Sequence, residues 1–196
     1  MVSDLFALIA LSLRRPAEAA RALLALRLPN GAVWMGVGIV ACLGVLSSWI
    51  GQAITITDPT LAELMAQISP LFFAVFTVVT LALSAFAFFQ TGRVLGGQGS
   101  FRDVLLAVTW VQAVLVAAQV ALIALSVLIP AVAGLLSLAV FVWSLIAVIV
   151  FLREAHQFQG TGRAIGTFLM GIALLGFALS FLMGLAGPAG VSPNGL

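Results

Sequence analysis

The sequence lacks lysine and tyrosine, and it contains one cysteine, one histidine and few charged residues. Only 7% of its 196 residues are charged, whereas a soluble domain has roughly 25%. The single cysteine, Cys42, excludes an internal disulfide and a multi-cysteine metal site. The net charge of +2 is too small to indicate a nucleic-acid partner. These absences exclude most soluble enzymes and nucleic-acid-binding domains.

Apolar residues make up 63% of the chain, and the mean hydropathy is +1.28. Both values indicate an integral membrane protein, for which the lipid bilayer is the first partner. The basic residues are all arginines, and they fall in alternate gaps between long apolar runs: Arg14, Arg15, Arg21, Arg27, Arg93, Arg102, Arg153 and Arg163. Arginines near membrane segments stay on the cytoplasmic side. We therefore expect a cytoplasmic N-terminus and a periplasmic C-terminus.

The apolar runs predict an all-α integral membrane protein with five transmembrane helices and a short N-terminal amphipathic helix at the interface. The uncharged run 104–152 is about twice as long as one crossing needs. Pro130 and Gly134 are expected to break this run into a hairpin. The predicted spans are about 33–54, 70–89, 104–127, 134–152 and 164–185.

The remaining segments complete the predicted organisation. Residues 1–31 form a cytoplasmic or interfacial segment, 32–186 the membrane domain and 187–196 a flexible tail. In residues 16–28, Ala19, Leu23 and Leu26 share one face, as in a helix lying on the membrane surface. The alternative is a plain connector whose arginines serve only topology. The break at Thr57–Asp58–Pro59 is followed by a short predicted outer helix, 60–68. The absence of lysine favours a GC-rich bacterial genome and hence a bacterial inner membrane.

The third predicted span carries hydrogen-bonding residues along one face: Thr109, Gln112, Gln119 and Ser126. Amides that faced lipid would be unsatisfied, so this face should point into the bundle. It is either the lining of a polar pathway or a set of interhelical hydrogen bonds. Ser137 and Ser144 in the fourth span are candidate partners for such bonds.

Small residues recur at intervals of four in two other spans: Gly44 and Ser48 in the first, and Gly176, Ser180 and Gly184 in the fifth. This spacing lets helix backbones approach closely. The close approach serves packing within one subunit or a dimer face.

Catalytic chemistry has little basis in this sequence. Metal sites need clusters of histidine, cysteine or carboxylates, and the lone histidine, His156, lies in a predicted cytoplasmic loop. A serine nucleophile needs a base, and the spans contain none. We therefore expect no enzyme activity and no cofactor. His156, between Glu154 and Gln157, is expected to be a solvent-exposed loop residue, with a functional role as the alternative.

The second predicted cytoplasmic loop, 90–103, holds the most specific local motif: Gly96, Gly97, Gly99, Ser100, Phe101 and Arg102. The glycines bend the chain, Ser100 can cap the next helix, and Phe101 can anchor at the interface. A phosphate-binding loop would usually supply a lysine, which is absent here.

This loop motif resembles the Yip domain family, named for proteins that interact with Ypt/Rab GTPases. The resemblance extends to Trp143–Ser144, to residues 153–158, and to Arg163 at the start of the last span. It implies five spans with a cytoplasmic N-terminus, and members that often form hetero-oligomers. The Asp-Leu-Tyr-Gly-Pro element of the eukaryotic members is absent, and Thr109–Trp110 stands where their third span has Gly-Tyr. Rab binding is therefore not carried over.

The sequence thus favours a non-enzymatic membrane protein that acts as a scaffold or accessory subunit. Its expected partners are other membrane proteins, a second copy of itself, or a bound phospholipid. Its expected interaction surface comprises the 96–102 loop, His156 and Arg163. The alternative is a small-solute permease or channel that uses the polar face of the third span.

Overall fold

The computed structural model describes residues 2–55 and 69–185, and the elements within these ranges are helices. They are α1 (Val2–Arg14), α2 (Pro16–Ala25), α3 (Asn30–Thr55), α5 (Pro70–Val94), α6 (Phe101–Leu128), α7 (Pro130–Ala155) and α8 (Thr161–Leu185). Five of them, α3 and α5 to α8, are long and apolar enough to cross a membrane. The predicted all-α, five-span fold is confirmed, and the chain is a multi-pass membrane protein.

Each long helix extends beyond the span predicted from hydropathy. Hydropathy locates the bilayer crossing, whereas a helix continues into the interface until a capping residue stops it. The predicted break at Gly134 is wrong, because this residue lies inside α7. The chain turns at Ile129, and Pro130 is the first residue of α7. Proline suits that position because the N–H it lacks would have no partner within the helix.

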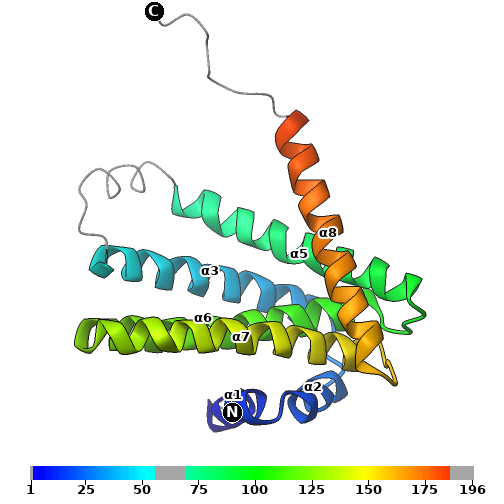
Figure 1. The fold of residues 1–196 in the computed structure, drawn as a ribbon, viewed down its shortest axis with the longest axis horizontal. Coiled ribbons are helices and arrows are strands. Elements are labelled where there is room, and N and C mark those ends of the chain that lie inside the picture. Colours follow the sequence, from blue (N-terminus) through cyan, green and yellow to red (C-terminus); the bar gives the residue numbers. More distant parts are fainter. Residues whose placement is uncertain (1, 56–68, 186–196) are drawn as a thin grey trace, which may run out of the picture.

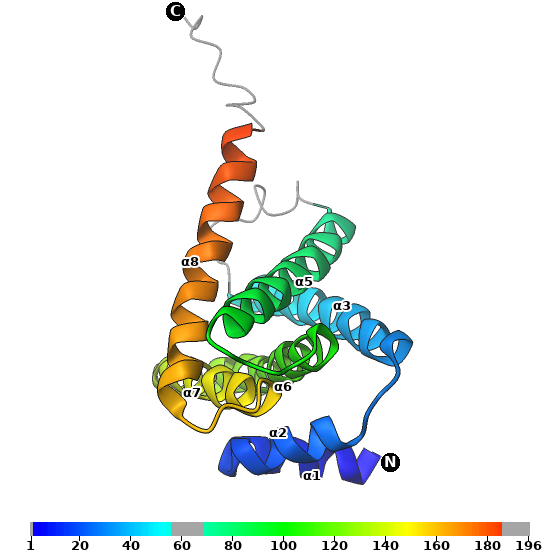
Figure 2. The ribbon, with the colours of Figure 1, turned by 90° about the vertical axis from the view of Figure 1, so that its right-hand side faces the viewer.

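The helix bundle is built around α6, which packs against α3, α5 and α7. Figures 1 and 2 show α8 running obliquely to the other long helices, and it packs against α5 and α7. The largest buried apolar side chains include Leu105, Phe151 and Leu152. All three lie near the end of the bundle formed by loops 95–100 and 156–160, which we call the loop end.

Two N-terminal helices, rather than the single predicted one, lie beside the bundle (Figure 2). The α2 residues Ala19 and Leu23 are buried, and α2 packs against α7. Leu26 does not share this buried face, because α2 ends at Ala25 and Leu26 is 59% exposed. The other N-terminal helix, α1, is attached to α6 by the Trp110 indole N–H, which donates a hydrogen bond to Ser12 Oγ at 2.9 Å.

The predicted break at 57–59, the outer helix at 60–68 and the tail at 187–196 lie outside the described residues. The division into an N-terminal segment, a membrane domain and a tail therefore stays a prediction.

Candidate functional site

The loop end begins with the C-terminus of α5, which has the hydrogen bonding of a Schellman motif. Gly96 has a left-handed backbone with φ +82°. The Gly97 N–H donates to the Gly92 carbonyl at 2.8 Å, and the Gly96 N–H donates to the Arg93 carbonyl at 3.0 Å. Glycine adopts this backbone at no steric cost. The motif folds residues 95–100 back over the end of α5.

The C-terminus of α7 repeats the same motif with a different residue at the left-handed position. Gln157 has φ 57°, and its N–H donates to the Glu154 carbonyl at 3.2 Å. The Phe158 N–H donates to the Arg153 carbonyl at 2.9 Å. A side chain is disfavoured in this conformation. The turn nevertheless places His156 on the inner side of the loop.

His156 is buried, with 1% of its surface exposed, so the expectation of a solvent-exposed loop residue was wrong. Its Nε2 lies 3.2 Å from the Phe88 carbonyl oxygen. A carbonyl can only accept a hydrogen bond, so Nε2 carries the proton and donates. In the neutral ring Nδ1 is then an acceptor, and it has no hydrogen-bond partner among the described residues. The ring also stacks on Phe158, with centroids 5.3 Å apart.

Three glycines leave the space that the His156 ring occupies. A Cβ on Gly92 would overlap the ring, and one on Gly97 would lie 2.6 Å from Nδ1. A Cβ on Gly99 would overlap the Ala155 carbonyl oxygen. The loop is also held through the backbone, because the Gln98 N–H donates to the His156 carbonyl at 3.0 Å. We call Gly92, Gly97, Gly99, Phe88 and Phe158 the His156 cradle.

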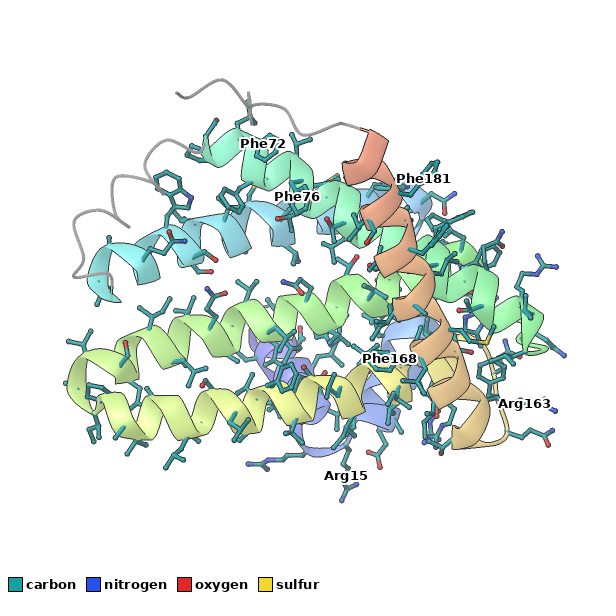
Figure 3. The ribbon with its side chains drawn as sticks, turned by 45° about the horizontal axis from the view of Figure 1, so that its top comes forward. Arg15, Phe72, Phe76, Arg163, Phe168 and Phe181 are labelled. Atoms are coloured by element: carbon teal, nitrogen blue, oxygen red, sulfur yellow. The ribbon has the colours of Figure 1, made fainter. Side chains whose placement is uncertain are left out.

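The cradle is joined to α8 through α5. The Thr91 hydroxyl lies 3.1 Å from the Thr167 carbonyl and 2.9 Å from the Ala87 carbonyl of its own helix. The Phe88 ring stacks on Phe168 of α8, with centroids 6.0 Å apart. Figure 3 shows Phe168 partway along α8 and Arg163 at the loop end. The buried histidine at the end of α7 is therefore linked to α8 through α5.

Burial lowers the pKa of His156 from its ordinary value of 6.5, and the hydrogen bond to the Phe88 carbonyl partly opposes this shift. The charged residues of the same region lie around the histidine rather than against its ring. Arg153 pairs with Glu154 at 2.6 Å, and Glu154 also lies 3.5 Å from Arg21 of α2. Burial therefore favours the neutral form of the ring.

The start of α6 brings together three other loop-end residues singled out in the sequence: Ser100, Phe101 and Arg102. Ser100 caps this helix as predicted, since its Oγ accepts from the Asp103 N–H at 3.2 Å. Phe101 packs edge-on against Phe89, with centroids 6.0 Å apart. Arg102 pairs with Asp103 at 3.3 Å, and Arg163 lies exposed beside Gly96.

The polar face of α6 packs mainly against α3. Gln119 Nε2 donates to Ser48 Oγ at 3.1 Å, Thr109 is buried, and Ser126 donates to the Ile123 carbonyl of its own helix. Gln112 is half-buried. Ser137 and Ser144, the expected partners, instead donate to carbonyls of their own helix. The partner of the α6 amide is therefore α3, not α7.

The two sets of small residues differ in their surroundings. A Cβ on Gly44 would meet Val116 at 3.4 Å, so the pair Gly44 and Ser48 serves packing within the chain. Gly176 has nothing within 4 Å of its Cβ position, and Ser180 is exposed. The surroundings of Gly184 lie outside the described residues.

Several residues of the site were missed at the level of sequence. Gly92 and Phe88 gave no local signal, because their partner His156 is distant in the chain. A signal did exist on α3, where Gly36, Gly44 and Gly51 recur at heptad-like spacing. A Cβ on these glycines would meet Thr109, Val116 and Ile123 in turn, and those three residues recur every seven positions on α6.

The fold and the loop end define the class of the protein, which is a helical integral membrane protein. Among the described residues, no three or more histidine, cysteine or carboxylate side chains form a group that could bind a metal. The family model of the Yip1 domain matches residues 10–182. The chain belongs to the Yip1 domain family, as the loop motif indicated. Neither the comparison with curated proteins nor that with solved structures gave a match.

Proposed function

We propose that this non-enzymatic integral membrane protein acts as a scaffold or accessory subunit that binds other membrane proteins or lipids at its loop end. The proposal includes a bacterial inner-membrane location with the loop end in the cytoplasm. Sequence supports this side, because Arg93, Arg153 and Arg163 all lie in or beside the loop-end connections.

One observation carries the proposal: the most specific motif of the chain builds a surface that is packed against a buried side chain. The buried ring of His156 holds the 95–100 loop in place from beneath. The outer surface of the loop end carries three exposed polar side chains, those of Arg93, Gln98 and Arg163. Val94 beside them is 75% exposed. A preformed surface binds a partner with less loss of conformational entropy than a flexible loop does.

Capture of partners at native expression level tests the proposal. We expect the tagged protein, extracted in mild detergent, to retain a defined set of membrane proteins or lipids. The variant Arg93→Ala/Arg163→Ala should lose protein partners, whereas Arg15→Ala, whose side chain is 69% exposed on the N-terminal helices, should keep them. A strictly monomeric protein that retains neither protein nor lipid would contradict the proposal.

The transport alternative depends on the polar face of α6. The hydrogen bond from Gln119 to Ser48 uses part of this face for packing, and Gln112 is the amide left to line a path. Flux measured in liposomes separates the two functions. Solute uptake abolished by Gln112→Leu and Gln119→Leu, with folding intact, would favour a permease or channel.

A further inference from the structure

A long apolar groove lies between the N-terminal helices and the bundle. Its volume is about 880 Å³, within the roughly 300–1,000 Å³ of ligand cavities. The α1 residues Leu5, Phe6 and Ile9 form one wall, and α3 and α6 form the floor. On α6 the lining runs from Leu106 to Ile123, roughly 25 Å along the helix axis.

A second, more polar pocket of about 480 Å³ lies at the loop end. Val33 lines both cavities. The pocket is formed by the first turns of two long helices, with Asn30 from α3 and Ser100 and Arg102 beside and within α6. The first N–H groups of a helix have no partner within it, and the helix dipole favours an anion there. The Arg102 guanidinium adds a positive charge at the same place, where it also pairs with Asp103 at 3.3 Å.

We propose that the two cavities together form a glycerophospholipid site, with the lipid phosphate in the polar pocket at Arg102 and one acyl chain in the groove. This deepens the proposed function by naming a lipid class, and it rests on the loop end lying at a membrane surface.

The length and charge of the site select this occupant. The apolar part is longer than one leaflet of the bilayer core, about 15 Å, so it accommodates a complete acyl chain. The charges set the orientation, because Arg102 lies in the polar pocket whereas Asp4 lines the groove on α1. An anionic headgroup is attracted to the first and repelled by the second.

A buried hydroxyl inside the groove gives an independent indication. Thr109 lines the groove and is 5% exposed, and its Oγ1 has no hydrogen-bond partner among the described residues. Buried polar atoms are nearly always satisfied. Thr109 lies seven residues after Arg102, on the same face of α6. A lipid whose phosphate binds Arg102 brings its ester carbonyls, which are acceptors, toward this hydroxyl.

Native mass spectrometry of the full chain, purified with phosphatidylglycerol or phosphatidylcholine, tests the site. We expect one retained phosphatidylglycerol per chain. Ala117→Phe, which fills the groove from an exposed position, should reduce the retained fraction at least fivefold, whereas Ala121→Phe, outside the lining, should not. Arg102→Gln should abolish the preference for phosphatidylglycerol over phosphatidylcholine, whereas Arg15→Gln should preserve it.

Four results would overturn the lipid site. They are the absence of a retained lipid in the wild-type chain, equal retention in Ala117→Phe and Ala121→Phe, binding of inorganic phosphate without lipid, and a mass that shows a second chain in place of the lipid. Circular dichroism and thermal unfolding confirm that each variant is folded. Failure of the proposed function is distinguishable, because it is read as protein partners that are absent from the wild type or are kept by Arg93→Ala/Arg163→Ala, while lipid retention persists.

Discussion

The loop end and the opposite end of the same helices are held together by different interactions. At the loop end, α5, α7 and α8 meet through the His156 cradle and the contact of Thr91 with Thr167. At the other end Leu128 is 77% exposed and Phe177 is 71% exposed. Apolar side chains gain little by leaving lipid for other apolar side chains. Close glycine contacts and interhelical hydrogen bonds therefore fix the loop end, and the opposite end lacks a comparable cradle among the described residues.

The largest expected effect comes from closing the space beneath the histidine. Gly92→Ala places a methyl group where the His156 ring lies, and we expect it to lower the free energy of unfolding by about 1–3 kcal/mol. Unfolding in mixed detergent micelles measures this loss. The control is Gly134→Ala, another helical glycine, with nothing within 4 Å of its Cβ position. Equal stability of the two variants would refute the cradle.

Lowering the pH should destabilise the loop end because the His156 ring takes up a proton. Burial lowers the pKa of His156 below 6.5, so the folded state binds fewer protons at this ring than the unfolded state does. The free energy of unfolding therefore decreases as the pH falls below about 6.5, by at most ~1.4 kcal/mol per pH unit, until the pH passes the folded-state pKa. Unfolding at several pH values measures this dependence. His156→Gln should remove this component, and an unchanged pH profile in that variant would contradict the assignment.

A stabilising change is expected at the second Schellman motif. Gln157 holds a left-handed backbone with φ 57°, and Gln157→Gly should raise the free energy of unfolding by about 1 kcal/mol. Gln159→Gly is the matched control, because Gln159 is exposed and its φ is not positive. A Gln157→Gly protein less stable than its control would show that the side chain has a role of its own.

The smallest expected effect is at the polar face of α6. Gln119→Leu removes the hydrogen bond to Ser48, and we expect a loss of about 0.6 kcal/mol. A double-mutant cycle with Ser48→Ala isolates this interaction. Additive losses in the two single variants would mean that the pair does not interact.

Much of the fold could be predicted from local sequence, because the bilayer penalises charge strongly enough to leave uncharged runs. The start of α6 could also be predicted from Ser100, because a helix cap depends only on residues that are close in the sequence. The role of His156 was not readable. The histidine interacts with glycines 92, 97 and 99, which are more than fifty residues away in the chain. In the sequence, a single histidine between Glu154 and Gln157 is typical of a solvated loop. The groove beside α1 could not be predicted either, because its lining comes from helices that are distant in the sequence.

Hydrogen–deuterium exchange of the 95–100 amides, in wild type and His156→Ala, tests the central claim that the buried histidine fixes this surface. We predict slow exchange of the Gln98 and Gly97 amides, which donate to the His156 and Gly92 carbonyls, and markedly faster exchange in the variant. Rapid exchange of both amides in the wild-type protein would contradict the account.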